Sequence, residues 1–217
     1  MKYFRDIFEI IKKRSWKVYA LLFGVFVLFF LIGFSGGGYM LENDPSMVEE
    51  FINEIKNTEI IQSFFDLMQK GEYFNIASLI FIHNSQVAVV NYVLGITFIL
   101  PLLIELFNGM IIGFFFGVSP KVFVTFIDGA GFFIILVMEV IATTLTAVEG
   151  MYLTYSIIRP QIMWKTKSRL KSAKKTFRQS IKILLFALAL LLISAIIETL
   201  LIHYLWVRNI QSVVIGI

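Results

Sequence analysis

The chain has 217 residues, of which 58% are hydrophobic and 16% aromatic, and its formal net charge is +4. The mean hydropathy of +0.83 lies far above that of soluble domains. These values exclude a soluble globular protein and predict an integral membrane protein of one domain, with room for about five or six spans of about 20 residues. The absence of cysteine excludes disulfides and thiolate metal sites.

The first third of the chain predicts a basic helix, a membrane span and an acidic segment. Residues 1–17 hold six Lys or Arg and two acids among apolar residues at helical spacing, which is typical of a basic amphipathic helix at a cytoplasmic interface. A span is predicted at 18–34, and it is longer than a signal-peptide core, so we expect it to be retained. Residues 39–72 hold eight acids and two Lys, and their apolar spacing predicts extracytoplasmic amphipathic helices.

The rest of the chain predicts four more spans, at 78–99, 102–117, 131–158 and 183–207. The second and third spans are expected to turn at Pro101. A re-entrant hairpin that enters at Asn84 and leaves at Gly117 is the alternative. A linker at 118–130 and a basic cytoplasmic loop at 159–182 connect the later spans. The predicted fold class is therefore an all-α, polytopic bundle of about five transmembrane helices with an extracytoplasmic amphipathic segment.

The basic residues predict the orientation of the bundle. Fifteen of the 19 Lys and Arg lie in residues 1–17 and 159–182. Five passages put both segments on one side, and positive charge stays in the cytoplasm. We therefore expect a multi-pass cell-membrane protein with a cytoplasmic N-terminus and an extracytoplasmic C-terminus. Juxtamembrane Lys and Arg next to the lipid bilayer indicate topology and anionic lipid rather than nucleic acid.

Polar side chains inside the apolar segments are the candidate functional residues. A charge at the bilayer centre costs about 2.5–3.5 kcal/mol, so such residues face the bundle interior, a watery cavity or a partner. The candidates are Asn84, Glu105, Asn108, Glu139, Glu149 and Glu198. Counting the helical rise places Glu139 and Glu198 in the outer half and Glu105 and Glu149 nearer the cytoplasm. Asn84, beside His83, is expected to cap a turn at the outer interface. The roles of the acids stay open between structural hydrogen bonding, ion coupling and contact with a partner protein.

Small residues at four-residue spacing predict a helix-packing seam. Gly109, Gly113 and Gly117 share one helix face with Glu105, and small residues on one face let helix backbones approach closely. Ala142 and Gly150 lie on a similar face of the following span. We expect these two faces to meet each other or their copies in a homodimer.

The sequence lacks the patterns of the common catalytic sites. It has no G-x-S-x-G motif, no phosphate-binding loop and no H-E-x-x-H motif. Its two histidines, His83 and His203, have no partner four residues away with which to bind a metal ion from one helix face. An intramembrane aspartyl dyad uses two aspartates, whereas the acids in question here are glutamates. The prediction is a non-enzymatic protein with no catalytic residues, no cofactor and no metal site.

An ordered set of residues from Phe81 to Tyr155 resembles the stage II sporulation protein M family of integral membrane proteins. The matching residues are Phe81, Asn84, Gly95, Ile96, Asn108, Gly109, Gly113, Gly117, Glu139, Ala142, Ala147 and Gly150. The family usually has His and Gly four and three residues before this Glu, where the present chain has Ile135 and Leu136.

The resemblance implies a membrane anchor for peptidoglycan-degrading partners that is not itself a hydrolase. Our leading hypothesis from the sequence is accordingly a non-enzymatic membrane scaffold, forming a homodimer and positioning membrane or extracytoplasmic partner proteins. One alternative is a proton- or cation-coupled transporter or channel that uses Glu105, Asn108, Glu139 and Glu149. Another is the membrane subunit of an ATP-driven system that docks through residues 159–182.

Overall fold

The structure, a computed structural model, describes residues 2–118 and 126–215. Every regular element in these two ranges is helical. The elements are α1 (Lys2–Lys13), α2 (Trp16–Asn43), α3 (Pro45–Lys56), α4 (Glu59–Lys70), α5 (Tyr73–Leu94), η1 (Gly95–Thr97), α6 (Leu100–Val118), α7 (Phe126–Ile158), α8 (Pro160–Trp164) and α9 (Arg169–Ile215). Helices α2, α5, α6, α7 and α9 are long and apolar enough to cross a membrane. The prediction of an all-α polytopic bundle with five spans is confirmed.

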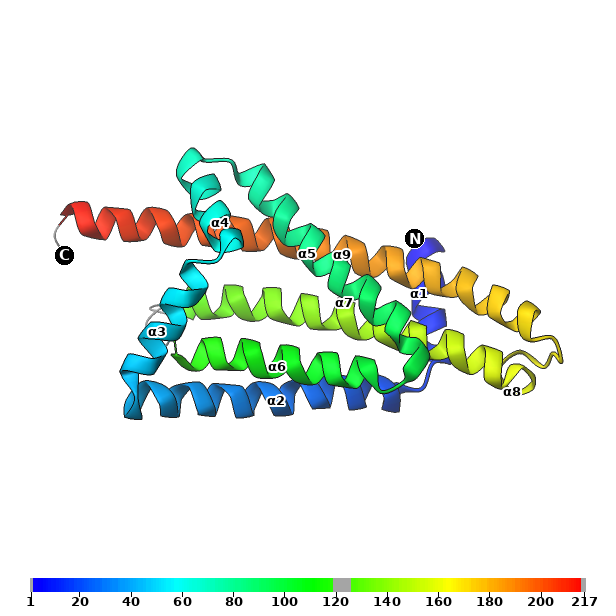
Figure 1. Cartoon of the computed structure of the whole chain (residues 1–217). Helices are drawn as coiled ribbons and strands as arrows, with labels where there is room; N and C mark the ends of the chain where they lie inside the picture. The colour runs from blue at the N-terminus through cyan, green and yellow to red at the C-terminus, as the bar shows by residue number, and fades with distance from the viewer. Residues whose placement is uncertain (1, 119–125, 216–217) are drawn as a thin grey trace.

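The long helices run side by side, and the short helices lie at the two ends of the bundle (Figure 1). Helix α7 packs against α2, α5 and α9, while α2 packs along the length of α6. We call the end with α3 and α4, residues 44–72, the acidic end. The opposite end, with residues 2–17 and 159–182, is the basic end. The predicted charge segregation therefore corresponds to opposite ends of one bundle.

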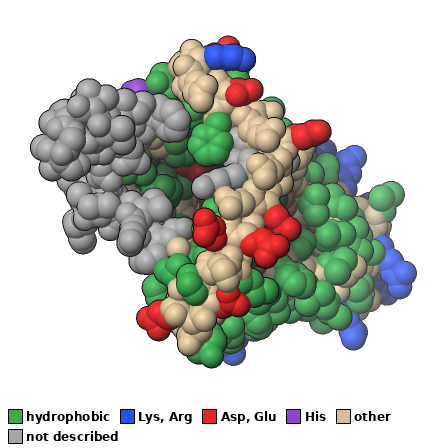
Figure 2. Space-filling view, turned by 60° about the vertical axis from the view of Figure 1, so that its left-hand side comes forward, with side chains coloured by type: hydrophobic (Ala, Val, Ile, Leu, Met, Phe, Trp, Pro, Cys, Tyr) green, Lys and Arg blue, Asp and Glu red, His purple; other side chains and the backbone are tan. Residues whose placement is uncertain are grey.

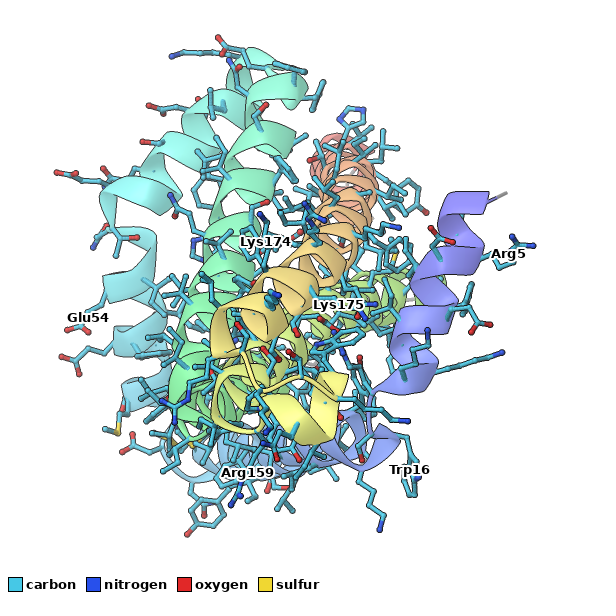
Figure 3. All side chains as sticks on the ribbon, turned by 90° about the vertical axis from the view of Figure 1, so that its right-hand side faces the viewer. Arg5, Trp16, Glu54, Arg159, Lys174 and Lys175 are labelled. Atoms are coloured by element: carbon cyan, nitrogen blue, oxygen red, sulfur yellow. The ribbon has the colours of Figure 1, made fainter. Side chains whose placement is uncertain are left out.

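The two ends carry opposite charge on their surfaces. All eight acidic side chains of residues 39–72 are exposed, and Figure 2 shows Asp and Glu side chains gathered on the face that α3 and α4 cover. At the basic end, Arg5 reaches outward from α1, while Lys174 and Lys175 lie on the first turns of α9 (Figure 3). Because α9 has 47 residues and is therefore about 70 Å long, it exceeds the roughly 30 Å of a bilayer core.

The sides of the bundle expose large apolar residues on several of the long helices. Examples are Leu31 of α2, Val93 of α5, Ile111 of α6 and Leu192 of α9, each about half exposed. Soluble proteins rarely expose contiguous apolar area on this scale. The surface is that of a membrane protein.

Helices α2 and α6 approach so closely that glycine is required on both of them. A Cβ added to Gly37 would lie 2.5 Å from the carbonyl oxygen of Phe114, and one added to Gly113 would overlap the backbone of Phe30. Gly33, Gly109 and Gly117 are in equally tight contact with the facing backbone. The seam on α6 thus packs on α2 within the same chain.

This pairing differs from the expectation that the faces of α6 and α7 meet each other or their copies. Ala142 of α7 packs with Ala88 and Ala187, and Gly150 lies against Gly95, where an added Cβ would be 2.6 Å from the Gly150 Cα. Periodicity identifies which face of a helix packs closely, but several other helices can supply the partner face. The homodimer stays a prediction, and the glycine seam no longer supports it.

Several helix boundaries also differ from the sequence-based expectations, and α2, expected at 18–34, continues to Asn43. The chain turns at Gly95–Ile99, and Pro101 lies in the first turn of α6, where proline's missing N–H costs nothing. Helix α5 continues through Asn84, so this residue caps no turn. The expected basic loop at 159–182 is largely helical, because α9 begins at Arg169. Of the expected linker at 118–130, residues 119–125 lie outside the described residues.

Asp44 separates α2 from α3 at the acidic end. Its carboxylate accepts hydrogen bonds from the Ser46 hydroxyl at 2.7 Å and from the Met47 N–H at 3.1 Å. These two hydrogen bonds, the one from Ser46 more than the one from Met47, hold the pKa of Asp44 below its usual value. This cap, with Pro45 at the helix start, begins α3 and turns the chain across the end of the bundle.

The glycine seam predicts different effects for two matched substitutions. Gly113→Ala places a methyl group in the Phe30 backbone, so we expect a loss of about 1–3 kcal/mol in the free energy of unfolding. Gly36→Ala adds the same methyl group where no atom lies within 4 Å, and we expect little change. Unfolding in detergent, monitored by circular dichroism, measures both. Equal stability of the two variants would contradict the seam.

Candidate functional site

An acid-lined cavity opens at the side of the bundle near the acidic end. It has a volume of about 630 Å³. We call it the entrance cavity; its lining residues are Glu59, Ser63, Leu79, Ile80, Ile82, His83, Asn84, Gln86, Glu139 and Glu198. Three glutamates from α4, α7 and α9 therefore converge on one opening. Carboxylates from different helices create a local negative potential that attracts cations.

A second cavity, of about 300 Å³, lies deeper between the long helices. It shares His83, Asn84 and Glu139 with the entrance cavity, and we call it the deep cavity. Its other lining residues are Phe26, Val87, Glu105, Asn108, Ile111, Ile112, Leu136, Val140, Thr143 and Leu191. Its walls come from α2, α5, α6, α7 and α9, so it lies between all five long helices, and the half-exposed Ile111 marks its side toward the surface. The shared residues place the two cavities next to each other.

Glu139 stands where the two cavities join, and its carboxylate is held by side chains from α5 and α9. The Asn84 amide donates to Glu139 Oε1 at 2.6 Å, and the Ser194 hydroxyl lies 3.4 Å from the same oxygen. Both donors can bond a charged carboxylate. A single acid on α7 thus joins three helices at the junction of the cavities.

Glu105 lines the deep cavity and has no such support. Its side chain is fully buried, and among the described residues neither carboxyl oxygen has a hydrogen-bond partner. The Thr143 hydroxyl lies beside it but donates to the Val140 carbonyl at 3.2 Å. A buried carboxyl group without a partner is costly whether it is charged or protonated. Such a group in a cavity is a candidate for binding something that enters from outside.

Glu149 lies apart from the cavities, in a buried ion pair at the basic end. Arg14 donates to both of its oxygens, from Nε to Oε1 at 2.9 Å and from Nη2 to Oε2 at 2.8 Å. The Ser180 hydroxyl adds a third bond at 2.8 Å, and the guanidinium stacks 4.6 Å from the Tyr152 ring centroid. This pair joins the end of α1 to α7 and α9.

The structure brings together residues that the sequence analysis had placed at different depths. Glu105, expected at the depth of Glu149, lines the same cavity as Glu139 and Asn108. Glu198 lines the entrance cavity. The sequence analysis missed Arg14 because it counted that residue only as part of the basic arm. No spacing rule in the sequence links Arg14 to an acid 135 residues away.

The described part of the chain has no cluster of side chains arranged to bind a metal ion. Within residues 2–118 and 126–215, no three His, Asp or Glu side chains are grouped so that they could hold a metal ion. The polar groups of the deep cavity are the Glu105 carboxyl, the Asn108 amide and the Thr143 hydroxyl, together with those shared with the entrance cavity. Their chemistry suits binding of a positively charged or hydrogen-bonding guest.

The chain is related to a known family of proteins. The family model of stage II sporulation protein M matches residues 23–201, which include α5, α6 and α7 entirely. The chain belongs to the stage II sporulation protein M family. The family match contains every glutamate of the cavities, whereas Arg14 lies before it. No curated protein and no solved structure matches the chain.

A buried and an exposed ion pair at the basic end predict unequal effects on stability. Glu149→Gln leaves the Arg14 guanidinium buried without its counter-charge, and we expect a loss of about 3–5 kcal/mol. Asp6→Asn breaks the pair between Asp6, whose side chain is 38% exposed, and Lys182, whose side chain is 40% exposed. Because this pair is exposed to solvent, we expect a loss below about 1 kcal/mol in the free energy of unfolding. Unfolding in detergent tests both. Losses of similar size would show that the buried pair contributes no more than the exposed one.

Proposed function

We propose that this membrane protein is a non-enzymatic, proton- or cation-coupled transporter or channel whose path runs through the two cavities. The observation that carries the proposal is Glu105, a fully buried carboxyl group without a hydrogen-bond partner in the deep cavity. Intramembrane acids are expensive and mark ion or substrate pathways by default. Nothing in the packing of α6 requires an acid at this position, so we assign it a role in binding.

The order of the acids supports a path for positive charge. Glu59 and Glu198 line the entrance cavity, Glu139 lies at the junction and Glu105 lines the deep cavity. Beyond Glu105, toward the basic end, the bidentate Arg14–Glu149 pair joins α1, α7 and α9. A cation that enters at the acidic end thus meets carboxylates first and a buried guanidinium last.

The charge of the two ends supports an orientation for this path. We propose that the basic end, with residues 2–17 and 159–182, lies in the cytoplasm, since Lys and Arg stay on that side. The acidic end and the C-terminus then lie outside, and the entrance cavity faces the exterior of the cell or the outer leaflet.

A scaffold that positions partner proteins is the second candidate. The observation that favours it is the acidic end, where α3 and α4 expose acidic side chains across the end of the bundle (Figure 2). A homodimer would have to use a surface other than the α6 glycines, which α2 already covers. Docking of an ATP-driven partner would use the basic first turns of α9. Neither role accounts for Glu105.

The decisive experiment is flux through proteoliposomes that contain the purified protein. We expect wild-type protein to carry protons or monovalent cations, and Glu105→Gln and Glu139→Gln to reduce that flux by at least tenfold. Glu54→Gln is the matched control, because Glu54 is an exposed acid of α3 outside both cavities (Figure 3). Its flux should equal that of wild type.

Absence of flux in every correctly folded variant would contradict transport. Co-purification of a partner that depends on the acids of α3 and α4 would then favour the scaffold. Folding of each variant is checked by size-exclusion chromatography before reconstitution.

A further inference from the structure

We propose that the two cavities bind an organic ammonium ion, with its charged head at Glu105 and its apolar body extending toward the entrance. The inference rests on the proposed function, which requires a cation in this path, and it adds the chemical class of that cation. Three features support it: the volume of the cavities, the composition of their walls and the Glu105 carboxyl group, which has no hydrogen-bond partner among the described residues.

The volume of the cavities suits an organic molecule. The deep cavity holds about 300 Å³ and the adjoining entrance cavity about 630 Å³. Small-molecule sites are typically about 300–1,000 Å³. A dehydrated inorganic cation would occupy a small fraction of this space and leave the rest to be filled with water.

The walls of the deep cavity suit an apolar body with one charge. Phe26, Val87, Ile111, Ile112 and Leu136 line the deep cavity together with Glu105. Ca²⁺ takes about six to eight oxygen ligands, whereas an ammonium group needs a carboxylate and a few acceptors. Glu105 supplies the carboxylate, and the side-chain oxygens of Asn108 and Thr143 are further acceptors in the same cavity.

Glu105 supplies the second, independent sign of a ligand. Its side chain is fully buried and its oxygens are unpartnered, unlike those of Glu139, which Asn84 and Ser194 contact, and Glu149, which Arg14 holds. An ammonium head beside Glu105 would form a charge-assisted hydrogen bond and satisfy this carboxyl group. Glu198 and Glu139 lie along the way in, where they favour entry of a cation over an anion.

The entrance cavity provides a route for the apolar body. Leu79, Ile80 and Ile82 of α5 form an aliphatic wall beside Glu198 and Glu139. A ligand with its head at Glu105 can place a chain of several methylenes against aliphatic side chains of both cavities. Affinity should therefore depend on both charge and length.

The test is binding of a series of n-alkylammonium ions, from methyl to hexyl, to the full chain in detergent, measured by isothermal titration calorimetry. We expect affinity to rise about fourfold per methylene, since each buried methylene contributes about 0.8 kcal/mol. Alcohols of the same length should bind at least tenfold more weakly. Glu105→Gln should lower the affinity for hexylammonium at least tenfold, and Glu54→Gln should leave it unchanged.

A second variant changes the shape of the cavity and keeps every carboxylate. Ile112→Trp adds bulk to the wall of the deep cavity. We expect this variant to lose the gain in affinity with chain length while it still binds methylammonium. This result separates a chain held in the cavity from one held in the detergent micelle, and it keeps the test valid if Glu105→Gln does not fold.

Three outcomes would overturn the inference. Equal affinity of wild type and Glu105→Gln for every alkylammonium ion, together with an unchanged gain per methylene in Ile112→Trp, would place the ligand in the micelle. Glu105-dependent binding of Na⁺ or K⁺ without any binding of alkylammonium would identify an inorganic cation, and the proposed function would stand. Absence of Glu105-dependent binding of any of these cations, together with absence of flux, would reject both proposals.

Discussion

The contact between the backbones of α2 and α6 is the constraint on which the arrangement of the cavity depends. Glycines on both helices let the backbones meet without intervening side chains, and van der Waals packing of this kind drives helix association where lipid removes the hydrophobic driving force. Glu105 lies four residues before Gly109, so it is on the same face of α6. The packing that brings Gly109 against the Phe26 backbone therefore also turns Glu105 into the bundle, where Phe26 lines the same cavity. One repeat of small residues both holds the helices together and buries an acid.

Three buried acids of the bundle differ in how many partners their carboxyl groups have. Glu149 has a counter-charge, a hydroxyl donor and an aromatic neighbour, which is what a structural acid in a low-dielectric interior needs. Glu139 is contacted by Asn84 and Ser194 but still faces both cavities. Glu105 faces a cavity and has no partner in the described chain. The series runs from an acid that joins three elements to an acid without a hydrogen-bond partner among the described residues, although all three look alike in the sequence.

The two ends of the molecule complement this interior. Exposed acidic side chains lie at the end of the bundle nearer the entrance cavity, while at the basic end the buried Arg14 forms an ion pair with Glu149 of α7. Helix α1 is fastened there by its apolar face as well, since Ile7 and Ile10 pack with Leu145 and Ile183. Membership of the stage II sporulation protein M family gives a membrane protein, and the charge pattern and the cavities suggest what this member does.

The sequence by itself determined the fold class, the number of apolar helices, the family and the face of α6 that packs closely. The fold class, the number of helices and the packing face follow from composition and from periodicity along single helices, which are local. The family follows from the ordered set of matching residues between Phe81 and Tyr155. Only the tertiary structure decided that the α6 glycines meet α2, that Glu105 joins Glu139 and Asn84 at one cavity, and that Glu149 pairs with Arg14. Each of these contacts joins helices far apart in the chain, and periodicity carries no information about which neighbour a face will meet.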